Sequence, residues 1–153
     1  MAEINKNLVV KIVKLKKNAI LPAYQTEHSA GMDLHACLDE PLTINPFERL
    51  AVPTGVAIEL PIGYESQIRA RSGLSFKYGI TTVNGIGTID SDYRGEYSVL
   101  LINLGSEPFL IEPGMRIAQL VIASHEHVDW DEAKSLSDTK RGSGGYGSTG
   151  LNA

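Results

Sequence analysis

The feature that most constrains the fold of this 153-residue chain is its series of short apolar runs, which glycine and proline interrupt at close intervals. Short runs of apolar or alternating residues, bounded by turn-forming residues, are typical of β-strands. Helical periodicity is scarce, and only residues 73–78 are expected to form a short helix. We therefore predict an all-β fold: a sandwich, a jelly roll or a barrel. The expected strands are residues 8–15, 49–52, 56–60, 64–71, 97–103 and 116–124.

Size and charge limit the classes of partner. The length fits one domain, and the apolar fraction of 42% is enough for a core. The 14 basic and 18 acidic side chains give a net charge of −4. This balance does not indicate a nucleic-acid-binding surface, whereas a small anionic ligand needs only a few local cations. Lys11 alternates with Val10 and Ile12, which favours a strand with one solvated face over a nucleic-acid patch.

The chain carries no signal for an oxidising compartment or a membrane. Cys37 is the one cysteine, so no intrachain disulfide can form. No run approaches the roughly 18 apolar residues of a membrane span, and the N-terminal residues lack the apolar segment of a signal peptide. We expect a soluble, cytoplasmic protein without a membrane partner.

The last part of the chain differs in composition from the rest. Residues 135–140 are mostly polar, and residues 142–150 contain five glycines. We therefore predict a β domain over residues 1–134 and a flexible arm over residues 135–153. A disordered terminus would explain the glycines alone, but the arm also holds groups that can stack on a ring or bind phosphate oxygens. These groups are Arg141, Ser143, Tyr146, Ser148 and Thr149.

A second candidate for phosphate binding is the segment ARSGLS at residues 70–75, which overlaps the end of an expected strand. Backbone N–H groups at the start of a helix attract anions. Arg71 can grip a phosphate, and Ser72 can donate from its hydroxyl. An ordinary turn with a helix cap would explain the same residues.

Residues 87–96, GTIDSDYRGE, combine turn-forming residues with three carboxylates, a tyrosine and an arginine. A β-hairpin is one explanation. Asp90, however, follows the apolar Ile89, where a partly buried carboxylate could act as a base. Asn84, just upstream, can both donate and accept hydrogen bonds, which suits the edge of a pyrimidine.

Polar residues also occur within and after the last expected strand. Gln119 interrupts an apolar run and either caps backbone groups or faces a ligand. His125 and His127 have a spacing that can chelate zinc, but no third ligand accompanies them, so a zinc site is not expected.

Five segments together resemble the five ordered motifs of the trimeric dUTPase family. The resemblance covers about residues 12–150, nearly the whole chain, and the order and spacing of all five motifs make it specific. The motifs are AGMDLHA at 30–36, ARSGLS at 70–75, GTIDSDYRG at 87–95, PGMRIAQL at 113–120 and RGSGGYGSTG at 141–150.

The resemblance implies a distorted, jelly-roll-like β-barrel and a homotrimer with active sites at its subunit interfaces. It implies hydrolysis of dUTP to dUMP and pyrophosphate, which supplies dUMP for thymidylate synthesis and keeps uracil out of DNA. Mg²⁺ is expected to be held mainly by the substrate phosphates. The alternatives are a dCTP deaminase-like enzyme, which is similar in fold, and a trimer that binds a nucleotide without turnover.

The resemblance also implies roles for residues around the phosphates. Asp90 matches the carboxylate that activates water for attack on the α-phosphorus. Asp33 matches the carboxylate that reaches the metal through water. The positions that match phosphate-binding residues are Arg71, Ser72, Gly73, Gln119, Arg141, Ser148 and Thr149.

The remaining implied roles concern the nucleoside. Asn84 and main-chain groups near Ser98 match the residues that read uracil. Tyr93 matches the ring that packs under deoxyribose and leaves no room for a 2′-hydroxyl. Tyr146 stands where the family usually has a phenylalanine stacked on uracil, and a tyrosine keeps the same aromatic face.

Overall fold

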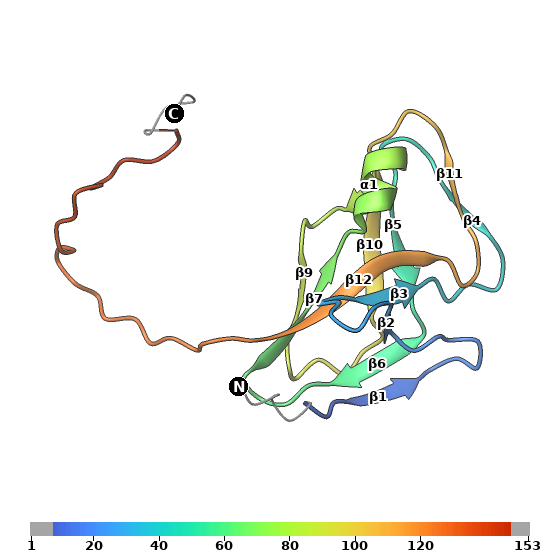
Figure 1. Cartoon of the computed structure of the whole chain (residues 1–153), viewed down its shortest axis with the longest axis horizontal. Coiled ribbons are helices and arrows are strands. Elements are labelled where there is room, and N and C mark those ends of the chain that lie inside the picture. The colour runs from blue at the N-terminus through green and yellow to red at the C-terminus, as the bar shows by residue number, and fades with distance from the viewer. Residues whose placement is uncertain (1–7, 148–153) are drawn as a thin grey trace.

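The computed structural model describes residues 8–147, which form an all-β body with one short helix (Figure 1). The predicted all-β class is confirmed, and the helix, α1 (Ser72–Tyr78), is the one expected at residues 73–78. The strands are β1 (Lys11–Lys14), β2 (Ala23–Tyr24), β3 (Met32–His35), β4 (Leu42–Ile44), β5 (Arg49–Pro53), β6 (Val56–Glu59), β7 (Tyr64–Arg69), β8 (Ile80–Thr82), β9 (Gly87–Ile89), β10 (Ser98–Asn103), β11 (Phe109–Ile111) and β12 (Arg116–Ser124).

The largest sheet contains five antiparallel strands in the order β2-β3-β12-β7-β9. A second sheet has the order β5-β10-β8, and the pairs β1-β6 and β11-β4 complete the body. The successive strands β4, β5, β6 and β7 each belong to a different one of these sheets. This repeated passage from sheet to sheet is the pattern of a jelly-roll-like fold, in agreement with the expectation.

The core is formed by apolar side chains from both larger sheets and from the strand pairs β1-β6 and β11-β4. Leu34 and Leu120 of the largest sheet are 1% exposed, and Val52 and Val99 of the second sheet are fully buried. All four belong to one continuous apolar cluster. Along β10 the buried residues alternate with more exposed ones, because successive side chains of a strand point to opposite faces. Burial of one face of each sheet therefore holds the two sheets together.

All six expected strands are present, with ends that differ by a few residues. β12 has the predicted bounds, whereas β1 and β7 are shorter than predicted. The sequence patterns missed β2, β3, β4, β8 and β11, which have two to four residues each. Segments this short carry too little alternation to be recognised, and they are strands because a neighbouring strand offers them hydrogen bonds.

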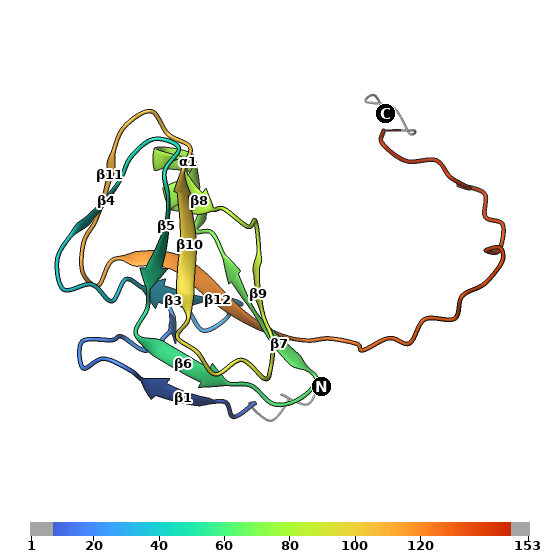
Figure 2. The ribbon, with the colours of Figure 1, turned by 180° about the vertical axis from the view of Figure 1, so that it is seen from behind.

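After β12 the described chain contains no helix or strand, and it runs away from the body in both views (Figures 1 and 2). Val128, Trp130 and Leu136 in this stretch are largely exposed. Within residues 8–147, no helix has the length and apolar character needed to cross a membrane.

Candidate functional site

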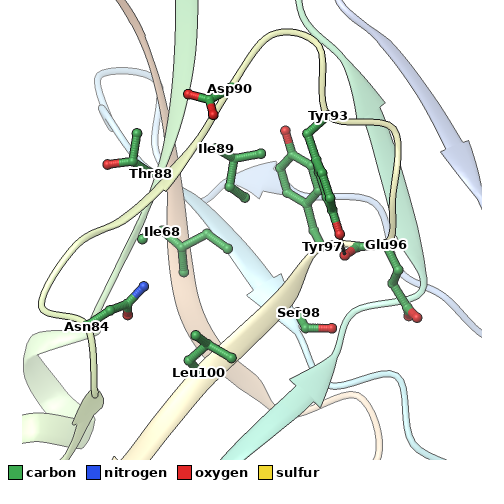
Figure 3. Close-up of a pocket in the computed structure, with 11 residues that line it drawn as sticks. Ile68, Asn84, Thr88, Ile89, Asp90, Tyr93, Glu96, Tyr97, Ser98 and Leu100 are labelled. Carbon is green, nitrogen blue, oxygen red and sulfur yellow. Dashed lines mark hydrogen bonds between the residues drawn. The ribbon is translucent and has the colours of Figure 1, made fainter.

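A cavity of about 330 Å³ lies between β9, the start of β10 and the loop that joins them (Figure 3). This volume is within the usual range of small-molecule sites, about 300–1,000 Å³. Four residues that the sequence singled out line the cavity, namely Asn84, Asp90, Tyr93 and Ser98. The other lining residues are Ile68, Gly87, Thr88, Ile89, Glu96, Tyr97 and Leu100.

The strands on either side of the cavity belong to different sheets. β9 pairs with β7, with Ile89 opposite Ser66, whereas β10 pairs with β5 and β8. The simple hairpin considered for residues 87–96 is therefore wrong, because β9 and β10 do not pair with each other. Since the two strands diverge, the loop between them spans an opening that can admit a ligand.

The loop after β9 is folded into a tight turn by its own polar groups. The N–H of Tyr93 donates to the carbonyl oxygen of Asp90 at 3.2 Å. The guanidinium of Arg94 donates to the carbonyl oxygens of Ser91 and Tyr93 at 2.6 and 3.0 Å. These bonds hold the side chains of Asp90 and Tyr93 at the rim of the same cavity. Asp90 itself is exposed in the single chain, so the expectation that it would be partly buried is wrong for this structure.

Tyr93 is held in place from two directions. Its hydroxyl donates to the carbonyl oxygen of Glu96 at 3.1 Å, and its ring centroid lies 6.2 Å from that of Tyr97. Gly95 makes this arrangement possible, because a Cβ at that position would lie 2.3 Å from the Tyr93 hydroxyl. The loop is also anchored to the β5–β6 turn, where the N–H of Gly55 donates to Oε1 of Glu96 at 2.8 Å.

A separate polar cluster lies where β3, β7 and β12 meet. Oδ1 of Asp33 is 3.2 Å from Nε of Arg71, and Oδ2 of Asp33 is 3.1 Å from NH1 of Arg116. NH1 of Arg71 also donates to the carbonyl oxygen of Arg116 at 3.0 Å. Nε2 of Gln119 donates to the carbonyl oxygen of Ala70 at 2.9 Å, so this glutamine does cap a backbone group. The cluster fixes the chain just before α1.

His35 lies on the same strand as Asp33, opposite Arg116 in the β3–β12 register. Burial lowers the pKa of its imidazole from 6.5, Asp33 opposes this shift, and Arg116 and Arg71 add to it. The Nδ1 atom of His35 is buried and has no hydrogen-bond partner within residues 8–147. The structure therefore favours the neutral form of this histidine.

The first turn of α1 follows the polar cluster directly. Arg71 occupies the N-cap in an extended conformation and makes no side-chain cap bond. The first backbone bond of the turn joins the N–H of Ser75 to the carbonyl oxygen of Arg71 at 3.0 Å. The N–H groups before Ser75 have no partner within the helix, which is the general condition for anion binding at a helix start. Ser72 and Gly73 are exposed at this end.

The arm residues lie apart from both groups. Nε of Arg141 donates to the carbonyl oxygen of Gly144 at 2.8 Å within a local turn. Tyr146 is fully exposed on the extended tail. Ser148 and Thr149 lie outside the described residues. The single chain thus brings together the cavity residues and, separately, the cluster of Asp33, Arg71 and Gln119, but it does not bring the arm to either.

The structure adds residues that the sequence did not single out for the site. Arg116 was placed only within a strand, although it shares the carboxylate of Asp33 with Arg71. Glu96 and Tyr97 line the cavity next to Tyr93. The acidic character of residues 87–96 pointed toward Glu96, but no pattern in the sequence indicated that Tyr97 faces Tyr93.

The antiparallel body, a cavity lined by carboxylate, amide and phenol groups, and a glycine-rich tail together define a jelly-roll-like β protein with a small-molecule site. A family model described as dUTPase matches residues 17–150. The chain belongs to the dUTPase family.

Relatives of known name support this assignment over nearly the full length. The deoxyuridine 5′-triphosphate nucleotidohydrolase of Rickettsia felis is 59% identical over 143 residues, which are 93% of this chain and 97% of that protein. The protein of the same name from Rickettsia conorii is 58% identical with the same coverage. A solved structure of the Staphylococcus bacteriophage 80alpha dUTPase with dUpNHpp has a TM-score of 0.86 at 26% identity, covering 95% of this chain and 100% of that one.

Proposed function

We propose that this chain hydrolyses dUTP to dUMP and pyrophosphate with Mg²⁺, in sites that form between the subunits of a homotrimer. The observation that carries the proposal is the convergence of Asn84, Asp90, Tyr93 and Ser98 on one cavity in a chain of the dUTPase family. The Rickettsia relatives carry the corresponding activity in their names. The reaction supplies dUMP for thymidylate synthesis and removes dUTP before it enters DNA.

Asp90 is the proposed base that orients and deprotonates the attacking water. It directly follows β9, and the backbone bond from Tyr93 holds it at the cavity rim. Its exposure in the single chain leaves room for water beside the carboxylate. The water attacks the α-phosphorus in line with the pyrophosphate leaving group. Positioning and charge stabilisation supply most of the rate, with a smaller share from proton transfer.

The nucleoside is read at the other side of the cavity. The amide of Asn84 can donate and accept at once, which matches the edge of uracil, and main-chain groups near Ser98 complete the hydrogen bonds. A pocket built to pair with uracil leaves its own polar groups unpaired with cytosine, which is a strong form of discrimination. Tyr93 packs under deoxyribose and leaves no space for a 2′-hydroxyl.

The phosphates are proposed to bind at the start of α1. Ser72 and Gly73 offer unpaired N–H groups, and Arg71 is held in place by Asp33. Gln119 uses one amide hydrogen for the carbonyl of Ala70, which leaves the second for a phosphate oxygen. Arg141, Ser148, Thr149 and the ring of Tyr146 close over the triphosphate and the base from the arm.

Mg²⁺ fits the residues present if the substrate supplies most of its ligands. Within residues 8–147, no group of three or more acidic, histidine or cysteine side chains can hold a metal alone. Asp33 has one ion pair on each carboxylate oxygen, and a carboxylate oxygen has more than one lone pair, so it can still accept from a metal-bound water. The metal would neutralise phosphate charge and so assist departure of pyrophosphate. A dUTPase of phage phi11, similar in fold at 22% identity, is described as coordinating a structural Mg(II) ion.

A trimer is proposed because one chain leaves the functional groups apart. The described part of the arm makes no contact with the cavity in the single chain, although the family motif in it is complete in sequence. The tail exposes Val128, Trp130 and Leu136, and the body has an apolar groove of about 590 Å³. Subunit association would bury such surfaces. A cytoplasmic location belongs to the same proposal, since the one cysteine, Cys37, is buried and free.

The decisive experiment compares pyrophosphate release from dUTP, dTTP, dCTP and UTP, with and without Mg²⁺. We expect release from dUTP that is faster with Mg²⁺ and far slower with the other three. Ammonia release from dCTP would instead support a deaminase. Binding of dUTP without pyrophosphate release would support a non-catalytic nucleotide-binding trimer.

A further inference from the structure

Tyr97 is the largest fully buried side chain of the protein's described part, yet it lines the cavity. It is 1% exposed, whereas Tyr93, beside it, is 45% exposed. The two ring centroids lie 6.2 Å apart, with the ring planes inclined by 39° (Figure 3). This distance is within the range of attractive aromatic pairs, about 4.5–7 Å. The ring of Tyr97 therefore lies behind the ring of Tyr93, which is proposed to contact the sugar.

Tyr97 is fixed by bonds at every polar group. The N–H of Tyr97 donates to the carbonyl oxygen of Val56 at 2.9 Å. The carbonyl oxygen of Tyr97 accepts two bonds from Thr54, one from its N–H at 3.1 Å and one from the Thr54 hydroxyl at 2.5 Å. Its own hydroxyl is 2.9 Å from Oγ of Ser66, which is fully buried. Ser66 belongs to β7 and lies opposite Ile89, the residue before Asp90. The Ser66–Tyr97 pair thus joins the β7–β9 side of the cavity to the β10 side.

Tyr93 has fewer constraints of its own. Its hydroxyl is bonded to the carbonyl oxygen of Glu96 at 3.1 Å, which limits the tip of the side chain. The tilt and depth of the ring depend on what lies behind it, and that is Tyr97. A tyrosine phenol is protonated at neutral pH, and burial raises the pKa of Tyr97 further, so its hydroxyl keeps the proton for the bond to Ser66.

We propose that Tyr97 is a positioning residue for sugar discrimination: its ring, oriented by the hydroxyl pair with Ser66, holds Tyr93 where a ribonucleotide cannot fit. This inference rests on the proposed function, because it concerns how dUTP is separated from UTP. Without the ring behind it, Tyr93 can retreat and make space for a 2′-hydroxyl. The Tyr97 ring and its hydroxyl pair with Ser66 therefore weaken the binding of UTP more than they affect the binding of dUTP.

The test measures kcat and KM for dUTP and UTP in wild type, Tyr97→Leu, Tyr97→Phe, Ser66→Ala and the Ser66→Ala/Tyr97→Phe double variant. Tyr97→Leu should lower the ratio of kcat/KM for dUTP to that for UTP about tenfold, mainly through a lower KM for UTP. Tyr97→Phe and Ser66→Ala should each lower it about threefold. In the double variant this ratio should be no lower than in either single variant, because both substitutions remove the same interaction.

Val99→Ala is the matched control, since Val99 is fully buried in β10, two residues after Tyr97, and does not line the cavity. It should lower thermal stability and leave the ratio at the wild-type value. An unchanged ratio in folded Tyr97→Leu would overturn the inference. If that variant does not fold, an unchanged ratio in both Tyr97→Phe and Ser66→Ala would overturn it.

The failure of the proposed function has a different signature. In that case the wild-type protein releases no pyrophosphate from dUTP. The inference is then tested by dissociation constants for dUpNHpp and its ribonucleotide counterpart UpNHpp. We expect the same order of ratios among the variants, and equal ratios in all of them would overturn it.

Discussion

The carboxylate of Asp33 is paired with the guanidinium of Arg71, with 3.2 Å between Oδ1 and Nε. Arg116 occupies the other carboxylate oxygen at 3.1 Å. The sequence suggested that Asp33 serves a metal and that Arg71 serves a phosphate. The ion pair links metal binding to phosphate binding, because Asp33, proposed to reach the metal through water, also holds the phosphate-binding Arg71 in position.

Asp33→Asn should therefore weaken both stability and phosphate binding. The Asp33 side chain is only 11% exposed, so loss of its charge leaves two guanidinium groups without a carboxylate partner and should lower the free energy of unfolding by about 1–3 kcal/mol. The KM for dUTP should rise more than kcat falls. Urea denaturation and steady-state kinetics measure the two effects. Glu59→Gln, in the exposed Lys11–Glu59 pair, is the control and should change neither. A wild-type KM in Asp33→Asn would contradict the link.

Asp90→Asn should keep nucleotide binding and lose most turnover. Asparagine has the same shape but cannot accept a proton from water, so kcat should fall by about 10²–10⁴-fold. Binding of dUpNHpp, measured by calorimetry, should stay within about threefold of wild type. The control is Asp92→Asn, since Asp92 is exposed in the same loop and does not line the cavity. Pyrophosphate release near the wild-type rate in Asp90→Asn would exclude Asp90 as the base.

Deletion of residues 141–153 should leave the assembly intact and abolish efficient turnover. The described part of this segment lies outside the sheets and the apolar core, so the β body does not depend on it. The loss of phosphate and ring contacts should lower kcat/KM for dUTP by about 100-fold or more. Light scattering checks the oligomer, and pyrophosphate release checks activity. A truncated protein with full activity would show that the arm is not a lid.

Tyr146 allows the stacking role of the arm to be separated from its hydroxyl. Tyr146→Phe keeps the aromatic face and should change the affinity for dUpNHpp by less than about threefold. Tyr146→Ala removes the face and should weaken binding by about 1–3 kcal/mol, the usual range for a base stacked on an aromatic ring. Titration calorimetry gives both values. Equal affinities in the alanine and phenylalanine variants would contradict stacking on the base.

His35 should make the protein less stable in mild acid. Burial lowers the pKa of the folded-state imidazole below 6.5, so the unfolded chain binds the proton more readily. Stability is therefore complete above pH 6.5 and falls as the pH drops below it, since protonation stabilises the unfolded state. Thermal unfolding at pH 7.5 and 5.5 should show a decrease that His35→Gln reduces. His28→Gln, at an exposed position, should leave the decrease unchanged. An equal decrease in wild type and His35→Gln would exclude His35 as the cause.

Much of the fold was predictable from local patterns. β12 has the predicted bounds because its long apolar run between Pro113-Gly114 and the polar His125 is unambiguous. The helix after Arg71 was also predictable from the turn-forming residues before it. The order of five motifs was enough to indicate the family, and the family model matches residues 17–150.

The residues of the site were predictable one by one, but their grouping was not. Asn84, Tyr93 and Ser98 were expected to bind the nucleoside and Asp90 to activate water at the α-phosphorus, and all four do line one cavity. The position of the arm relative to that cavity does not follow from one chain.

The sequence by itself determined which segments extend, where the chain turns and which polar groups are available, because these depend on neighbouring residues. Only the tertiary structure decided that β9 pairs with β7 and not with β10, and that Tyr97 lies behind Tyr93. It also decided that Arg116 shares the carboxylate of Asp33, 83 residues away in the chain. The physical reason is that such pairings are selected by the packing of the whole core, in which a short strand or a single ring contributes too little to leave a local pattern.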